Sequence, residues 1–160
     1  MRFGVISDTH IPGRSQSVPR RVFELFDGVD AILHAGDFVQ ALVLEELRAI
    51  APTHGVLGNC DSYDLAGLLP ATTSIDADGL KIGMIHDSGT TAGRRRRMAS
   101  LFSGHRVVIF GHSHQPVVED DDDLLLLNPG SACDPRAAKV PSVAILEVRN
   151  GVPKAELIRI

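Results

Sequence analysis

The sequence predicts an α/β fold in which two stacked β-sheets carry helices on their outer faces. Strand-like and helix-like segments alternate over residues 1–57, a pattern typical of parallel strands joined by right-handed crossovers. The last third of the chain instead contains short apolar runs separated by turn-type residues, which favours a mainly antiparallel second sheet. Two stacked sheets with helices outside them account for the whole chain.

The first half of the chain supplies strands and helices in turn. The expected strands are the apolar runs over residues 1–7, 30–35 and 53–57. The first helix begins near Ser17, with Pro19 in its first turn, and ends at Gly28. The second helix covers residues 39–50, in which apolar positions recur on one face.

The second half of the chain is richer in strands. A basic helix is predicted over residues 91–102, after two neighbouring strands that are joined by a turn at residues 76–79. The strands of this half are expected over residues 73–75, 81–85, 106–110, 117–118, 124–127, 143–148 and 155–160.

Length, composition and charge restrict the class of protein. The 160 residues fit one domain, residues 1–160, and the hydrophobic content of 44% is ordinary for a globular protein. The formal charge of -4 argues against broad electrostatic binding to nucleic acid or to acidic membranes. No apolar run approaches the roughly 18 residues of a membrane span. Two cysteines, Cys60 and Cys133, make no disulfide framework, so we expect a cytoplasmic protein.

Five apolar runs end in side chains that can bind metal ions. Loops that leave the carboxyl ends of parallel strands converge on one crevice, so we expect these side chains to meet. Taken singly, each is an ordinary turn former, helix cap or polar loop residue. Together they combine carboxylates, imidazoles and an amide oxygen, a mixture that suits transition metals better than Ca²⁺ and is large enough for two ions. They are Asp8, His10, Asp37, Asn59, His86, His112 and His114.

These motifs, in this order, resemble those of the calcineurin-like metallophosphoesterases. The resemblance covers residues 1 to about 149, and Gly58-Asn59-Cys60-Asp61 with Asn128-Pro129-Gly130-Ser131 resembles the small, single-domain phosphodiesterase subgroup. It implies a four-layer αββα sandwich of two mixed sheets and a dinuclear metal centre. The metals expected are two Mn²⁺ ions, with Fe, Zn²⁺, Ni²⁺ and Mg²⁺ as alternatives.

The resemblance also implies a division of the ligands between the two metals. One ion would be bound by Asp8, His10, Asp37 and His114, and the other by Asp37, Asn59, His86 and His112, with Asp37 bridging. A metal-bridging hydroxide would then attack the phosphorus in line. The residues expected to take part in catalysis are Asp37, Asn59, Cys60 and Asp61.

Cys60 is an informative departure from the family pattern. Many relatives carry histidine there, which can supply positive charge to the phosphate and a proton to the leaving group. A thiol is neutral and donates only weak hydrogen bonds, so we expect a small phosphodiester substrate rather than a dianionic monoester. Asp61 would orient the missing histidine, which leaves its role open. Cys60 is disfavoured as a ligand because adjacent side chains tend to diverge.

The sequence also allows other interpretations of function, of two basic segments and of oligomeric state. The rival function is a non-catalytic protein-binding scaffold, since a retromer subunit resembles this fold. A nuclease is disfavoured by the acidic balance and the scarcity of aromatic residues. The Arg94–Arg97 run is interpreted as a solvated helix face, with attraction of a polyanionic substrate as the alternative. Arg136 contacts either the substrate or its own turn. A homodimer is the default expectation.

Overall fold

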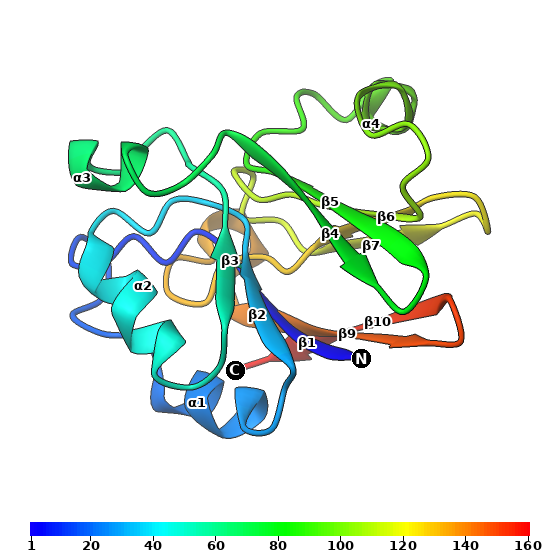
Figure 1. Ribbon diagram of the computed structural model, residues 1–160. Helices are drawn as coiled ribbons and strands as arrows, with labels where there is room; N and C mark the ends of the chain where they lie inside the picture. Colours follow the sequence, from blue (N-terminus) through cyan, green and yellow to red (C-terminus); the bar gives the residue numbers. More distant parts are fainter.

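Two five-stranded β-sheets lie face to face in the computed structural model, which describes residues 1–160 (Figure 1). The first sheet has the strand order β10-β9-β1-β2-β3 and the second has the order β4-β5-β6-β8-β7. The first sheet contains β1 (Arg2–Ile6), β2 (Ala31–His34), β3 (Thr53–Gly55), β9 (Ser142–Arg149) and β10 (Val152–Arg159). The second contains β4 (Thr72–Ala77), β5 (Leu80–Ile85), β6 (Val107–Ile109), β7 (Val117–Asp120) and β8 (Leu125–Asn128).

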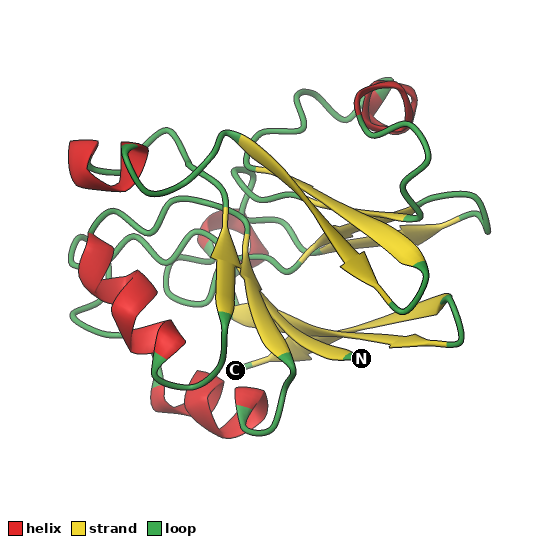
Figure 2. Ribbon diagram, viewed as in Figure 1, coloured by secondary structure: helices red, strands yellow, loops and turns green.

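Helices cover the outer faces of both sheets (Figure 2). The helices are α1 (Arg20–Phe26), α2 (Ala41–Arg48), α3 (Tyr63–Ala66), α4 (Arg94–Leu101) and the 3-10 turn η1 (Arg136–Ala138). Helices α1 and α2 pack on the first sheet and α4 packs on the second, so the predicted αββα sandwich is confirmed. None of these helices combines the length and the apolar character that crossing a membrane requires.

Apolar side chains alternate between the two faces of the inner strands, so both faces have to pack against other elements. In β1, Phe3 and Val5 enter the core between the sheets. Gly4 lies between them and faces α1, where an added Cβ would come 2.6 Å from the Phe26 ring. In the second sheet, Val108 packs on the α4 side. The inner strands of both sheets are therefore buried on two faces, as expected where parallel strands are joined by helices.

The last third of the chain is divided between the sheets, which corrects one prediction. Strands β9 and β10 join the first sheet, with β9 antiparallel to β1. Strands β7 and β8 join the second sheet, in which β5, β6 and β8 are parallel neighbours. The prediction that this third forms a mainly antiparallel second sheet is therefore wrong. The physical reason is that β9 is apolar on both faces: Ala144 and Leu146 enter the inter-sheet core while Val143 and Ile145 face the helix side, and only an inner strand buries both.

Candidate metal centre

The loops that follow β1, β2, β3, β5 and β6 meet at one end of the sandwich. Five of their side chains sit on residues whose φ angles are positive, between 48° and 65°. L-residues rarely adopt this conformation, and it persists where surrounding contacts hold the backbone, often at functional sites. These residues are Asp8, His10, Asp37, His112 and His114.

The first group of polar atoms joins Asp8, His10 and His114. The Nε2 atoms of the two histidines lie 3.2 Å apart, and His114 Nε2 lies 3.4 Å from Asp8 Oδ1. His114 donates its Nδ1–H to the backbone carbonyl of Asp134, so in the neutral ring Nε2 carries the lone pair. The atoms that face one another here are therefore hydrogen-bond acceptors, unless His10 carries its ring proton on Nε2.

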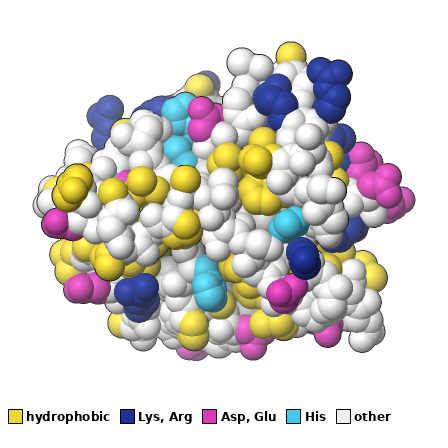
Figure 3. All heavy atoms as spheres, turned by 45° about the horizontal axis from the view of Figure 1, so that its top comes forward, with side chains coloured by type: hydrophobic (Ala, Val, Ile, Leu, Met, Phe, Trp, Pro, Cys, Tyr) yellow, Lys and Arg dark blue, Asp and Glu magenta, His cyan; other side chains and the backbone are white.

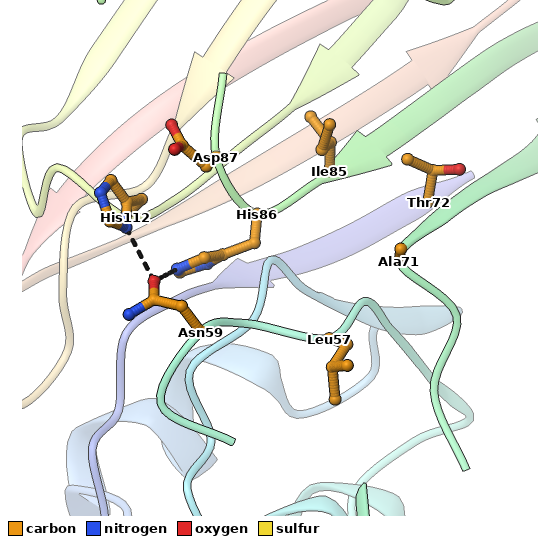
Figure 4. A pocket seen from close by; sticks show the side chains of 8 residues that line it. All are labelled: Leu57, Asn59, Ala71, Thr72, Ile85, His86, Asp87 and His112. Carbon is orange, nitrogen blue, oxygen red and sulfur yellow. Dashed lines mark hydrogen bonds between the residues drawn. The ribbon is translucent and has the colours of Figure 1, made fainter. Parts of the chain in front are cut away.

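The second group joins Asn59, His86 and His112 (Figure 4). His86 Nε2 lies 3.0 Å and His112 Nδ1 lies 2.9 Å from the same atom, Asn59 Oδ1. His86 donates Nδ1–H to the carbonyl oxygen of Ala35 at 2.8 Å, which again leaves Nε2 as the acceptor in the neutral ring.

Asp37 lies between the two groups. Its Oδ2 atom is 3.5 Å from His10 Nε2 and 3.3 Å from His86 Nε2. Its Oδ1 atom accepts a hydrogen bond from the backbone N–H of Cys60 at 2.8 Å. One carboxylate oxygen therefore contacts both histidine groups while the other is held by the loop that follows β3.

The chemistry of these donors fits divalent cations. The nitrogen and oxygen atoms that face one another carry lone pairs, and too few protons lie between them to hydrogen-bond every atom. A cation stabilises such an arrangement. Burial raises the pKa of Asp8 to about 7, and a cation beside this carboxylate would favour its ionised form. Burial also lowers the pKa of His10 and of His114, which favours the neutral ring that binds metals. Imidazole nitrogen mixed with carboxylate oxygen suits Mn, Fe or Zn.

The hydrogen-bonded contacts of Asp61 are those of a residue that positions the site. Its carboxylate accepts backbone N–H bonds from Gly58 at 2.7 Å, Val39 at 2.8 Å and Asp37 at 3.3 Å. These bonds tie the loop after β2 to the loop after β3. Asp61 therefore holds the backbone of Asp37 in place, and the catalytic role expected for it stays a prediction.

Cys60 faces the centre together with its neighbour Asn59. The Cys60 Sγ atom forms one cluster with His10 and Asp37, whose potential ligand atoms all lie within 4.8 Å of one another. The Asn59 Nδ2 group lies 3.3 Å from the same sulfur. The expectation that these adjacent side chains diverge is therefore wrong, because the turn after β3 presents both. Partial desolvation and the nearby Asp37 carboxylate raise the pKa of the exposed Cys60 thiol, so it is neutral at pH 7.

Two glycines allow the loops to approach this closely. A Cβ at Gly58 would lie 2.1 Å from Asp37 Oδ1, and a Cβ at Gly111 would lie 2.0 Å from Ser7 Oγ and 2.8 Å from Asp8 Oδ2. Neither contact leaves room for a methyl group. The glycines that precede Asn59 and His112 are thus required by the packing of neighbouring carboxylates.

Residues 128–131 donate hydrogen bonds to two of the loops that carry candidate ligands. Ser131 Oγ donates to the Asp8 carbonyl oxygen at 2.7 Å, and Asn128 Nδ2 donates to the Gly111 carbonyl oxygen at 2.9 Å. This segment forms the tight turn that the sequence indicates, and it connects two ligand loops. Two contacts are expected for Arg136, one with the substrate and one with its own turn. The structure shows the second, because Arg136 Nε lies 3.3 Å from Asp134 Oδ2.

His34, two residues before Gly36, contacts two of the loops that carry candidate ligands. Its Nδ1 accepts the Gly36 N–H at 3.2 Å, and its Nε2 lies 3.2 Å from Thr9 Oγ1. Complete burial holds its pKa well below the ordinary value. The ring is therefore neutral and connects the loops that carry His10 and Asp37. Its position two residues before Gly36 is the one available signal in the sequence.

The four-arginine run of α4 is not simply a solvated face. Arg94 is buried with its guanidinium 4.9 Å from the centre of the Phe110 ring. Arg95 donates to two backbone carbonyls near the β7–β8 turn, and Arg97 donates to three carbonyls in the 88–92 loop. Basic side chains gather over α4 on the surface (Figure 3), yet three of the four are engaged by the chain itself. The prediction that this run forms a solvated helix face is therefore wrong for Arg94, Arg95 and Arg97.

Comparisons with known proteins agree with this arrangement. A domain model described as the calcineurin-like phosphoesterase superfamily domain matches residues 1–151. A probable metallophosphoesterase of Methanothermobacter thermautotrophicus is 40% identical over 162 residues, which cover 99% of this chain and 92% of that protein. The solved structure of an archaeal phosphodiesterase is 28% identical, with a TM-score of 0.75, and the match covers 99% of this chain and 100% of that one.

The same fold occurs in Vps29 proteins. The crystal structure of Vps29 from Chaetomium thermophilum has a TM-score of 0.82 over 100% of this chain and 97% of that one, at 22% identity. A likeness at this level of identity shows the fold and leaves the activity to the residues of the site.

Proposed function

Since the chain belongs to the calcineurin-like phosphoesterase superfamily, we propose that it is a metal-dependent phosphodiesterase whose two cations share Asp37. The family and the relatives support a metal-dependent phosphoesterase. The observation that carries the finer proposal is the position of Asp37 Oδ2, which contacts His10 at 3.5 Å and His86 at 3.3 Å.

The two groups of donors divide the proposed ligands. Asp8, His10 and His114 would hold one cation with Asp37, and Asn59, His86 and His112 would hold the other with the same carboxylate. Manganese is the proposed metal. When bound, the cations would supply Lewis-acid charge for the phosphate oxygens and make hydroxide available near neutral pH.

The chain's own residues orient this donor set. His86 and His114 each donate Nδ1–H to a backbone carbonyl, which directs Nε2 toward the centre. The Asn59 amide points its Nδ2 at the Cys60 sulfur, so its Oδ1 faces the histidines. Asp61 holds the backbone of Asp37. These contacts preorganise the ligands. The proposed reaction requires no covalent nucleophile.

The neutral thiol of Cys60 supports diesters over monoesters as substrates. Its pKa is raised by partial desolvation and by the Asp37 carboxylate, so it brings no positive charge to the phosphate. A phosphomonoester, mostly a dianion at neutral pH, would gain from a cation at this position. A diester carries one negative charge and depends on that cation less.

Hydrolysis of a chromogenic diester tests the proposal. The protein, freed of metal and then supplied with Mn²⁺, should hydrolyse bis-p-nitrophenyl phosphate, and a chelator should abolish the reaction. The Asp37→Ala variant should lose this activity, whereas Asp64→Ala, an exposed substitution on α3, should retain it. The absence of metal-dependent turnover across several diesters would favour the rival, a non-catalytic scaffold with the fold seen in Vps29.

A further inference from the structure

A pocket of about 350 Å³ opens beside the second group of donors. Asn59, His86 and His112 form one end of it, and the other end is lined by Leu57, Ala71, Thr72 and Ile85 (Figure 4). Ligand pockets range from about 300 to 1,000 Å³, so this one suits a single small organic group. Because the candidate ligands line the pocket, a group bound there would adjoin the phosphate.

Asp87 gives this pocket its charge. It is exposed, follows His86 directly and lines the pocket on the side of His112 (Figure 4). Its Oδ1 accepts the Gly89 N–H at 2.7 Å, which fixes the side chain in a turn. No lysine or arginine lines the pocket, so apart from the imidazoles and the cation that they would hold with Asn59, the carboxylate is its one charged group.

The nearby Arg97 forms no ion pair with Asp87. Arg97 lines the adjoining hollow together with Asp87, but its guanidinium donates to the carbonyls of Ser88, Thr90 and Ala92. No ion pair of the structure involves Asp87. A second negative charge on a substrate would therefore meet, at this wall, a carboxylate that forms no ion pair.

We propose that this pocket binds one ester group of the phosphodiester, accepts uncharged or cationic groups, and uses Asp87 to exclude anionic ones. The inference rests on the proposed function and narrows its substrate class. Leu57 and Ile85 provide the apolar wall against which an alkyl or aryl group packs. Asp87 is thus a specificity-determining residue of the site.

Symmetrical diaryl phosphates test this charge preference. Both rings carry the same para substituent, which is aminomethyl (cationic), methyl (neutral) or carboxymethyl (anionic), so the pocket meets that substituent in either orientation of the diester. The measured quantity is the ratio of kcat/KM for the cationic substrate to kcat/KM for the anionic one. The wild-type protein should favour the cationic diester.

Three variants locate the source of the preference. Asp87→Asn keeps an acceptor for the Gly89 N–H and should lower the ratio by about 3- to 10-fold, the size expected for partly screened charge–charge interactions. Thr72→Lys places a cation on the opposite wall and should lower it in the same direction without disturbing that turn. Asp76→Asn makes the same change in net charge on β4, outside the pocket, and should leave the ratio unchanged.

The outcomes separate this inference from the proposed function. If the methyl compound is hydrolysed with Mn²⁺ but the ratio is the same in the wild type, Asp87→Asn and Thr72→Lys, the inference is overturned and the phosphodiesterase stands. An equal shift in Asp76→Asn would overturn it too, because the preference would then reflect overall charge. If bis-p-nitrophenyl phosphate is hydrolysed with Mn²⁺ but the methyl compound is not, the pocket does not accept an uncharged group and the inference alone is overturned. If neither diester is hydrolysed by the Mn²⁺-loaded protein, the proposed function fails, and the inference fails with it.

Discussion

The Nε2 atom of His86 lies 3.3 Å from Asp37 Oδ2, while the other nitrogen of His86 donates to the carbonyl of Ala35. In the neutral ring both facing atoms are acceptors, so a proton or a metal ion must lie between them. Burial works to lower the pKa of His86, but the hydrogen bond and the charge of Asp37 outweigh it and raise the pKa. Protons and metal ions therefore compete for the same atoms.

This competition predicts that Mn²⁺ affinity rises with pH between 6 and 8. Burial raises the pKa of Asp8 to about 7, so below that pH the metal-free carboxyl holds a proton that a cation must displace. The raised pKa of His86 acts in the same direction. Each displaced proton should weaken binding by about tenfold per pH unit below the relevant pKa. Titration calorimetry at several pH values measures this slope, and an affinity independent of pH would refute it.

Loss of the Asp61 carboxylate should loosen the centre without removing a ligand. Asp61→Ala leaves the N–H groups of Gly58, Val39 and Asp37 without their acceptor. We expect about 10- to 100-fold weaker metal binding and a loss of about 1–3 kcal/mol in the free energy of unfolding. Urea denaturation and metal titration measure both, with Asp64→Ala as the control. Unchanged metal affinity would show that the loop keeps its shape without these bonds.

Replacing Cys60 by histidine should shift the substrate preference. Cys60→His places a group that can carry positive charge next to Asp37, and monoester turnover should rise relative to diester turnover by about 10-fold or more. Cys60→Ser, which stays neutral, is the matched control and should keep the wild-type ratio. The assay compares p-nitrophenyl phosphate with bis-p-nitrophenyl phosphate. A ratio that does not rise in Cys60→His contradicts the charge explanation.

A single methyl group at Gly58 should displace Asp37. The added Cβ of Gly58→Ala would lie 2.1 Å from Asp37 Oδ1, and overpacking of this kind costs about 1–3 kcal/mol. Metal binding and diester hydrolysis should fall together. Gly67→Ala, where the nearest atom to the new Cβ lies 3.6 Å away, should be tolerated. Retention of full activity in Gly58→Ala would mean that the loop after β3 can shift at little cost.

The fold was predictable where local patterns decide it. Apolar runs gave the strands that end near Asp8, Asp37 and His86, and the glycines and prolines gave their turns. The misplaced elements were β9 and its hairpin partner β10, because strand neighbours are chosen by tertiary packing. The position of β9 decides both. Its one readable signal is the unbroken apolar run over residues 143–146, which favours an inner strand rather than a half-exposed one.

The site was less predictable beyond the side chains at the strand ends. Asp61 bonds to the backbone of two different loops, and Arg97 bonds to backbone carbonyls of the 88–92 loop. Those partners have no side-chain signature, so residue types and spacing cannot reveal them. The direction of the Cys60 side chain likewise depends on the turn after β3, which only the folded chain defines.

The central claim is that two cations share Asp37, and anomalous diffraction from a crystal loaded with Mn²⁺ tests it most directly. The account predicts two anomalous peaks, one beside Asp8, His10 and His114 and the other beside Asn59, His86 and His112, with the Asp37 carboxylate between them. A single peak, or peaks that do not contact Asp37, would contradict it.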